Sequence, residues 1–318
     1  MDTNVKEMPV YNPGDIAVIN AIIANNGLKW EKAPEEGSSI PDDWVFNENM
    51  PQAGVKWSND EMNKRITGLI ISCMNISGEF NVSGLTKLKY LNCPGNNLKA
   101  LIATDLTELE ILNCSWSSLT ELYLPYGGKL ETLICSYNQI EKLNLSGLTK
   151  LKSIECNWNS LISIDLSGLS LLERFECNET TLATLDVSSL KGLKSLSCKQ
   201  NLLTKLKVSG LTILEKIDCS FNELTVLELS DLPMLKKLDC SFNELTALDV
   251  SGLIQLEELI CNHNHLTELD VEALMSLKLL CCSFNQIAML NMSEITRLVS
   301  LEELCRNNDS LLFDMLTC

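Results

Sequence analysis

A cysteine returns at an interval of 21 residues along most of this chain of 318 residues, and no other feature constrains the fold as strongly. The ten members of this cysteine ladder are Cys93, Cys114, Cys135, Cys156, Cys177, Cys198, Cys219, Cys240, Cys261 and Cys282. A fixed period of roughly 20 to 50 residues is typical of chains in which copies of one structural unit stack on each other. The sequence therefore predicts a long repeat array.

One template surrounds each ladder cysteine: L-x-x-L-x-C-x-x-N-x-L-x-x-L-x-V-S-G-L-x-x. An irregular copy begins at Ile66, the ten cysteine copies follow from Leu88, and a degenerate stretch from Leu298 to Leu311 closes the array. The segment x-L-x-C-x alternates, which predicts a strand, and stacked copies place such strands in a parallel sheet about 4.8 Å apart. The second half alternates too and is too short for a long helix, so an extended or turn-like segment is expected opposite the sheet.

The cysteine position is expected to be a narrow place in a thin core. Cysteine is small and readily buried, whereas leucine there would overpack the core. Cβ atoms of neighbouring ladder cysteines should lie about 4.8 Å apart, and a disulfide needs roughly 3.5 to 4.5 Å. We predict a column of free, buried, unreactive thiols; a metal-binding or redox array is the alternative.

A second ladder of asparagines lies three residues after the cysteines, at Asn96, Asn138, Asn159, Asn201, Asn222, Asn243, Asn264 and Asn285. A buried amide there can bond to backbone groups left unpaired where the chain turns out of the strand. Ser117 and Thr180 replace the asparagine in two copies, which are therefore expected to be looser.

These features resemble the short-repeat bacterial leucine-rich repeat proteins, a group related to internalins. The resemblance covers residues 66–311 and implies a right-handed solenoid of the α/β solenoid class, mostly β. It also implies a curved parallel sheet on the concave face and extended or turn-like segments on the convex side. An array of this kind needs caps at both ends.

Residues 1–65 resemble the N-terminal cap of such repeats. The stretch "DIAVINAIIANNG" predicts a short helix with Ile16, Ile19 and Ile23 on one face and its end at Gly27. Trp57 stands where the family often has a cysteine, so we expect this cap to rely on packing. Residues 312–318 are expected to form a short C-terminal cap, and a Cys305–Cys318 disulfide is left open.

Composition and motifs argue against several classes of function. A net charge of −17 would repel nucleic acid and anionic membranes, no apolar run is long enough to span a membrane, and "MDTNVKEMPV" is not a signal peptide. No catalytic motif is present, and the paired carboxylates lack a hydrophobic pocket. Cys261, His263 and His265 are the best metal candidates, but they are not expected to converge. We predict no enzyme, no cofactor and no metal.

Two outward-facing sets of residues are expected on the sheet. Lysine and glutamate alternate at the second position of each copy, which predicts pairing between neighbouring strands, at Lys152, Glu173, Lys194, Glu215, Lys236, Glu257 and Lys278. The third and fifth positions are charged in mid-array, at Glu155, Arg174, Glu176, Lys216, Asp218, Lys237, Asp239 and Glu258. Towards the ends they turn apolar, which makes them candidate anchors for a ligand.

The eighth position of the template carries most of the large aromatic side chains of the array. Two interpretations remain open: rings that stack along the strand edge, or a platform for a glycan or an apolar side chain. With the sheet positions, they give the candidate ligand-binding residues Tyr90, Ile111, Trp116, Ile134, Tyr137, Trp158, Arg174, Phe221, Phe242, Ile260, Leu279 and Phe284.

The resemblance implies a module that binds a protein or a glycan, outside the cell or on its surface. We expect it to be a monomer. A structural spacer or adhesin stalk is the alternative function, and a hydrolase that uses Glu176 or Asp218 is a weaker one. Unpaired thiols favour a reducing compartment, so a cytoplasmic location is the alternative address.

Overall fold

The computed structural model describes residues 9–46, 53–291 and 312–314, in two compact units, 1–151 and 152–318. Residues 298–311 and the side chains of 312–318, with the expected C-terminal cap and the Cys305–Cys318 pair, lie outside the description. The division into cap, solenoid and C-terminal cap stays a prediction.

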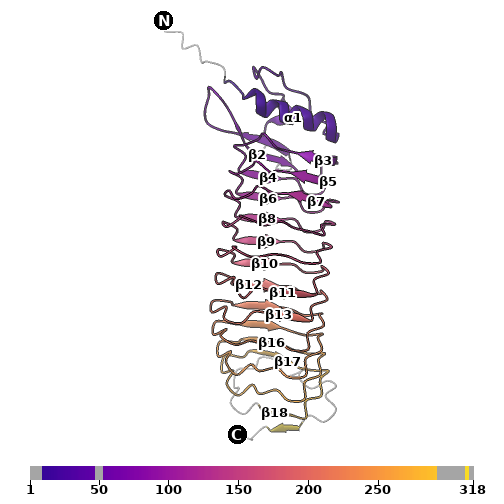
Figure 1. Ribbon diagram of the computed structural model, residues 1–318, viewed down its shortest axis with the longest axis vertical. Helices are drawn as coiled ribbons and strands as arrows, with labels where there is room; N and C mark the ends of the chain where they lie inside the picture. Colours follow the sequence, from indigo (N-terminus) through magenta and orange to yellow (C-terminus); the bar gives the residue numbers. More distant parts are fainter. Residues whose placement is uncertain (1–8, 47–52, 292–311, 315–318) are drawn as a thin grey trace. The chain divides into compact units, whose positions relative to one another are not determined.

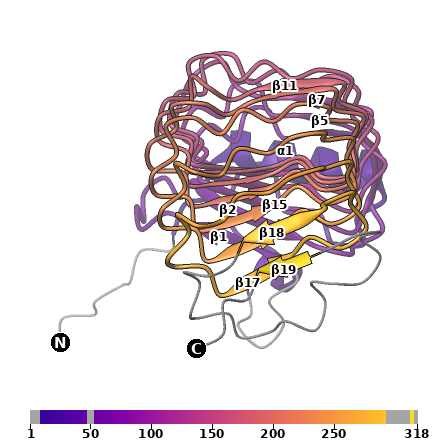
Figure 2. The same ribbon diagram turned by 90° about the horizontal axis from the view of Figure 1, so that it is seen from below.

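The first unit contains two sheets, whose strands lie one above the next (Figure 1). The main sheet runs in the order β1 (Ala53–Trp57), β2 (Ile66–Ile71), β4 (Tyr90–Asn92), β6 (Ile111–Asn113) and β8 (Thr132–Ile134). The second sheet consists of β3 (Ser77–Asn81), β5 (Asn97–Ile102) and β7 (Glu121–Tyr123). All these pairs are parallel except β1 with β2, and Figure 2 shows β5 and β7 on the opposite side of the unit from β1 and β2.

The second unit repeats this arrangement with shorter strands. Its main sheet runs β9 (Ser153–Glu155), β10 (Arg174–Glu176), β12 (Ser195–Ser197), β14 (Lys216–Asp218), β15 (Lys237–Asp239), β16 (Glu258–Ile260) and β17 (Leu279–Cys281). Two further pairs are β11 (Thr184–Asp186) with β13 (Lys205–Lys207), and β18 (Met289–Asn291) with β19 (Leu312–Asp314). Each ladder copy thus contributes one strand to a main sheet, which confirms the predicted solenoid, with extended segments rather than helices opposite the sheet.

Helices are few in the described chain. They are α1 (Pro13–Asn26) and the single turn η1 (Asp42–Trp44). Among the residues described, no helix combines the length and the hydrophobicity needed to cross a membrane.

The ladder cysteines form the predicted buried column. All ten have no exposed surface, and none of them forms a disulfide. Burial raises the pKa of Cys93 to about 12, and burial together with neighbouring ladder thiols raises the pKa of Cys219 well above its usual value. The thiolate is the reactive species, so these groups should be inert in the folded protein.

We expect a thiol reagent to distinguish the ladder from the other cysteines. Of the 14 cysteines, the ten of the ladder should react only after denaturation, because the folded protein hides them from the reagent. Exposed Cys73 and half-buried Cys281 should react in the native state, and Cys73→Ser should remove one fast-reacting group. Peptide mapping after brief native labelling checks this; rapid modification of Cys219 or Cys240 would show that the ladder is a reactive array.

The asparagine ladder joins each copy to the one before it. Asn243 accepts a hydrogen bond from the backbone N of Leu224, and its Nδ2 donates to the carbonyl oxygens of Cys219, Cys240 and Ser241, all at 3.0 to 3.2 Å. The pattern recurs at Asn138, Asn222, Asn264 and Asn285. As predicted, these amides bond to the backbone N–H and C=O groups that are left unpaired where the chain turns out of the strand.

The two exceptions behave differently. Ser117 is too short to reach the same partners, and its Oγ is buried with no hydrogen bond among the described residues. Thr180 keeps a bond to the carbonyl oxygen of Cys177 and another to Asn201 Oδ1. Only the copy with Ser117 therefore has a buried orphan group of the kind that costs stability.

The helix α1 packs against β3 and lies between the levels of the two sheets in Figure 2. Asn12 caps its N-terminus by accepting from the N of Asp15, and Gly27 ends it with φ 76°. Its buried apolar side chains are Ile16, Ile19 and Ile22. Ile23, predicted on the same face as Ile16 and Ile19, is half-buried, and Ile22 is buried beside them.

The cap does not rely on packing alone, and this corrects the sequence prediction. Asp15 has no exposed surface. Its carboxylate accepts hydrogen bonds from Nε of Arg65 at 3.0 Å and from a terminal guanidinium nitrogen of the same residue at 2.9 Å. The backbone N of Ile66 donates to the same carboxylate at 2.7 Å. This bidentate pair therefore ties the start of α1 to the start of β2.

Candidate binding surface

Two rows of opposite charge cross the main sheet of the second unit. The basic row occupies the third position of the repeat, with Arg174, Lys216 and Lys237, and the acidic row occupies the fifth, with Glu155, Glu176, Asp218 and Asp239. The residue between them on each strand is buried, so both rows face outward. A hollow of about 310 Å³ lies on this face, lined by residues of β12, β14, β15 and β16 that include Ser195, Ser197, Lys216, Lys237, Asp218 and Asp239.

The carboxylates of the acidic row lie side by side in pairs. Glu155 is in register with Glu176, and Asp218 with Asp239. Burial, and next the neighbouring carboxylate of Glu176, raise the pKa of Glu155. Burial also raises the pKa of Asp239, and the charge of Asp218 contributes in the same direction. Like charges in adjacent positions repel each other. The nearby cations Arg174 and Lys199 offset only part of this effect, because the pKa values of Glu155 and Asp239 stay raised.

One oxygen of each aspartate already has a structural role. Asp218 Oδ1 accepts from the N (3.0 Å) and Oγ (2.6 Å) of Ser220, and Asp239 Oδ1 accepts from Ser241 at the same two distances. These bonds build the turn after the strand, a role that the repeated sequence "DCSFN" could have signalled. The second oxygen of each carboxylate is left for a ligand.

The residues at the second position of the repeat differ from those of the two rows because they form ion pairs with each other. Lysine and glutamate pair between neighbouring copies as predicted, at Lys194–Glu173 (2.9 Å), Lys236–Glu215 (3.0 Å) and Lys278–Glu257 (2.6 Å). Lys237 pairs with Glu258 of the next copy at 2.5 Å rather than with Asp239. Within the described chain, Arg174, Lys216 and the four carboxylates of the acidic row form no ion pair.

An aromatic edge runs beside this face at the eighth position, where Phe221, Phe242, His263 and Phe284 stack in sequence. Neighbouring ring centroids are 4.1 to 4.2 Å apart, with interplanar angles of 9 to 14°. All four residues have φ of 54 or 55°, a left-handed conformation that is unfavourable for large side chains. The expectation of stacked rings is confirmed, but this backbone geometry was not predicted from the sequence.

Stacking decides which part of each ring a ligand can reach. The faces of Phe242 and His263 are covered by their neighbours, and the Nζ of Lys199 lies 5.3 Å from the centroid of Phe221. Phe221, Phe242 and Phe284 still expose 41%, 37% and 42% of their surface, so their edges are accessible. Ring edges carry partial positive charge, whereas ring faces are negative.

The two histidines do not form a metal site. His263 belongs to the stack, His265 Nε2 lies 2.6 Å from Glu244 Oε2, and Cys261 is fully buried. No group of three or more potential ligands in the described part of the chain is arranged to hold a metal ion. His263 and His265 instead line a hollow of about 400 Å³ beside Phe242 and Phe284.

The predicted anchors are all at least partly accessible, but they divide between the units. In the first unit Tyr90 is in register with Ile111, which is 37% exposed, and Trp116 stacks on Tyr137 at 3.7 Å. Ile134 is half-buried on β8. In the second unit Ile260 and Leu279 are half-buried beyond the acidic row, and Trp158 is 47% exposed. Their part in binding remains a prediction.

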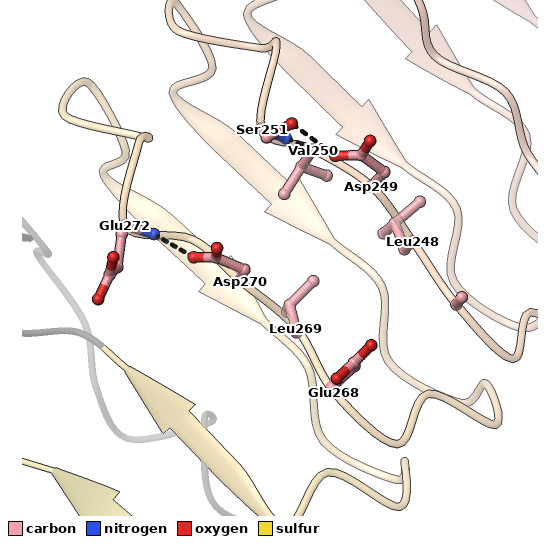
Figure 3. A pocket seen from close by; sticks show the side chains of 9 residues that line it. Leu248, Asp249, Val250, Ser251, Glu268, Leu269, Asp270 and Glu272 are labelled. Carbon is pink, nitrogen blue, oxygen red and sulfur yellow. Dashed lines mark hydrogen bonds between the residues drawn. The ribbon is translucent and has the colours of Figure 1, made fainter.

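The opposite side of the second unit carries another acidic hollow, of about 570 Å³ (Figure 3). Asp249 and Asp270 each accept a hydrogen bond from the backbone two residues later, at Ser251 and Glu272. Their carboxylates thus stabilise turns. Leu248 and Leu269, each one residue before the aspartate, are buried in the core. Turn formation accounts for these acidic residues.

Sequence reasoning missed one exposed surface. Each of four consecutive copies has an exposed apolar side chain at one of its last two positions, at Ile213 (40% exposed), Met234 (36%), Ile254 (58%) and Met275 (58%). These positions vary in the template, so only a comparison of all copies at positions 20 and 21 could have found them.

Comparison with known proteins supports the fold. No protein-family model and no curated protein sequence matches the chain significantly. Among solved structures, the functional domain of InlJ from Listeria monocytogenes, which includes a cysteine ladder, is 28% identical with a TM-score of 0.59 over 80% of this chain and 56% of that one. The leucine-rich repeat protein LIC12759 from Leptospira interrogans is 23% identical, with a TM-score of 0.61 over 69% of this chain and 62% of that one.

The leucine-rich effector YopM from Yersinia pestis is also similar, at 28% identity and a TM-score of 0.53 over 64% of this chain and 57% of that one. The chain thus spans little more than half the length of these proteins. The fold is an internalin-like leucine-rich repeat solenoid, as the sequence resemblance implied.

Proposed function

We propose that this leucine-rich repeat solenoid is a non-enzymatic module that binds a protein, through the main sheet of the second unit and its aromatic edge. The observation that carries the proposal is the outward acidic row beside accessible ring edges, on a sheet that no other part of the described chain covers. Exposed aromatic groups with adjacent polar side chains are typical of protein interfaces.

The geometry of the aromatic edge favours a protein over a glycan. Sugars bind aromatic residues mainly by laying C–H groups on a ring face, and here neighbouring rings occupy the inner faces. Accessible edges suit carbonyl or carboxylate oxygens and the face of a partner's aromatic ring. A glycan would therefore have to bind elsewhere.

The acidic residues support binding rather than hydrolysis. A glycosidase needs two carboxyl groups on either side of the scissile bond, one of them kept protonated by an apolar pocket. Asp218 and Asp239 instead lie beside each other in one row, and each uses an oxygen to hold a turn. A purely structural spacer would have no need of adjacent carboxylates that repel each other.

A selection experiment tests the proposal. We expect peptides selected from a random library on the immobilised protein to lose at least tenfold in affinity with Lys216→Glu or Phe242→Ser, which change the face and the edge. Thr204→Glu, an exposed residue on another part of the copy, serves as the control and should leave binding unchanged. Binding of glycan-array sugars but of no peptide, or binding insensitive to the face and edge variants, would contradict the proposal.

We also propose that the protein acts as a monomer outside the cell or on its surface, by the resemblance to internalins. The alternative, a cytoplasmic location, suits the free thiols of the ladder. Protease treatment of intact cells that express the native gene distinguishes the two, because only a surface protein would be digested, and light scattering gives the oligomeric state.

A further inference from the structure

We propose that the first unit binds a neutral oligosaccharide, with one sugar ring stacked on the outer face of Trp116 and the next sugars on the amides of the adjacent strands. This site goes beyond the proposed function, because it lies in a different unit from the face assigned to a protein partner. Three observations carry it: an open indole face, unpaired neutral donors and acceptors beside that face, and four successive segments without a charged residue.

The outer face of Trp116 is open because the preceding copy has a glycine at the eighth position. Gly95 is the neighbour of Trp116 along this edge, since its backbone N donates to the carbonyl oxygen of Ser115 at 3.0 Å. The inner face of the indole is covered by Tyr137 at 3.7 Å, and no other ring of the described chain stacks on it. Trp116 therefore keeps 59% of its surface exposed, whereas Phe242, with a ring on each side, keeps 37%.

The backbone conformation alone does not require this glycine. Gly95 has φ 69°, and Trp116 and Tyr137 adopt the same left-handed conformation with φ 54° and 58°. A Cβ atom on Gly95 would instead lie 2.6 Å from the Sγ of exposed Cys73. An aromatic side chain at this position would extend the stack and cover the indole. Together, Cys73 and Gly95 leave one ring face free for a ligand.

The strands beside the indole offer neutral hydrogen-bonding groups that have no partner in the described chain. Asn92 and Asn113 face outward in register on β4 and β6. Asn92 donates to Ser72 Oγ at 3.1 Å, which leaves its Oδ1 free. Asn113 Oδ1 accepts from the N and the Oγ of Ser115, which leaves its Nδ2 free. The hydroxyl of Tyr90, two residues before Asn92, is also unpaired among the described residues. An acceptor, a donor and a hydroxyl suit a sugar, whose hydroxyl groups donate and accept.

The second unit shows that the turn after the strand does not need an amide. Asp218 Oδ1 accepts from the N and the Oγ of Ser220 at 3.0 and 2.6 Å, and Asn113 Oδ1 accepts from Ser115 at 3.1 and 2.6 Å. Asparagine in place of aspartate thus removes the charge and leaves the turn unchanged. The free Nδ2 is what the first unit has and the second unit lacks.

The absence of charge selects a neutral sugar over a charged ligand. From the third to the tenth position, the first four copies contain no charged residue, in the segments 68–75, 90–97, 111–118 and 132–139. A cation on the indole would find no carboxylate in these segments and an acidic sugar no cation, although each would lose water. A pyranose with equatorial hydroxyl groups lays its axial C–H groups on the negative ring face and turns its hydroxyl groups to the amides. A neutral peptide is the competing occupant, and direct competition separates the two.

Calorimetric titration with hexasaccharides tests the proposal. The probes are the β-1,4-linked hexamers of glucose and of N-acetylglucosamine, whose equatorial substituents leave the ring faces flat, and a hexamer of galacturonic acid is the charged comparison. We expect at least one neutral hexamer to bind, and the acidic hexamer not to bind. Trp116→Ala should weaken binding at least tenfold. Asn113→Asp should do the same, although it keeps the oxygen that holds the turn.

A double variant blocks the indole face without removing any group that would contact the sugar. Cys73→Ala/Gly95→Phe removes the sulfur that a new side chain would meet and adds a ring over the indole, so it should abolish binding. Cys73→Ala alone should leave binding unchanged. Phe242→Ser is the matched control, because both faces of that ring are covered; it should keep sugar binding while peptide binding falls.

Several results would overturn the proposal: no binding of either neutral hexamer at millimolar concentration, equal binding of the acidic hexamer, or full affinity in Trp116→Ala or in Cys73→Ala/Gly95→Phe. Selected peptides that compete with the sugar and depend on Trp116 would assign the face to a peptide instead. If peptides bind through Phe242 and no sugar binds, this proposal fails and the proposed function stands. If sugars bind through Trp116 and no peptide binds, the reverse holds.

Discussion

Asp15→Ala should destabilise the first unit by about 3 kcal/mol, because breaking a buried ion pair leaves its partners without compensation. The substitution removes both bonds to Arg65 and the bond to the N of Ile66. We expect the lower end of the usual range, since the side chain of Arg65 keeps 22% of its surface exposed and can reach water. Urea unfolding followed by tryptophan fluorescence reports this region, where Trp30 and Trp44 are both buried.

Two further variants distinguish the stability lost with the ion pair from the stability lost whenever a carboxylate is removed. Asp105→Ala removes an exposed carboxylate of the same unit that bonds to the N of Gly84, and it should cost less than about 1 kcal/mol. Asp15→Asn keeps the acceptor for Ile66 but loses the charge, so it should fall between the two. If Asp15→Ala and Asp105→Ala unfold at the same urea concentration, the pair does not hold the cap.

Asn243→Ala should destabilise the second unit by about 3 kcal/mol. It leaves the backbone N of Leu224 unpaired, and a buried group without a partner costs about 1–3 kcal/mol. It also removes one of two hydrogen bonds from the carbonyl oxygens of Cys219 and Cys240, which keep those from Asn222 and Asn264. Hydrogen exchange offers a local measurement, because the amide of Leu224 loses its acceptor and should exchange faster. Urea unfolding by circular dichroism gives the global effect.

The control for this prediction is Glu223→Ala, an exposed residue next to a ladder asparagine, which should leave both measurements nearly unchanged. Asn243→Asp sharpens the test, because it keeps the acceptor but turns a carboxylate oxygen towards two carbonyl oxygens. Its penalty should be large at neutral pH and smaller in acid, where the carboxyl group becomes a donor. A native-like exchange rate at Leu224 in Asn243→Ala would mean that the amide is not the support we describe.

The repeat could be derived from the sequence because its information is local and is repeated ten times. The spacing of Cys219 and Cys240 predicted the coil, and the alternation around Ile217 predicted the strand and its buried side. The lysine–glutamate pairs followed from register alone, since in-register neighbours on parallel strands are close. Such features need no knowledge of distant contacts.

The cap and the details of the binding surface could not be derived in the same way. Asp15 and Arg65 are 50 residues apart, and neither carries a repeat signal. The left-handed backbone at Phe242 runs against the preference of a large side chain, because stacking and the bond from its N to the carbonyl oxygen of Asn262 outweigh local strain. The burial of Ile22 rather than Ile23 depends on how α1 meets β3, which only the folded chain determines.

The asparagine ladder also sets an order in which the copies can complete their hydrogen bonds during synthesis. Each side chain reaches back to the preceding copy, as Asn243 does to Leu224 and Cys219, and none of those bonds can form until the later copy exists. A chain that emerges from the ribosome therefore always ends in a copy whose turn is still open, and each new copy completes the previous one. Synthesis and folding should advance together, one coil behind the other.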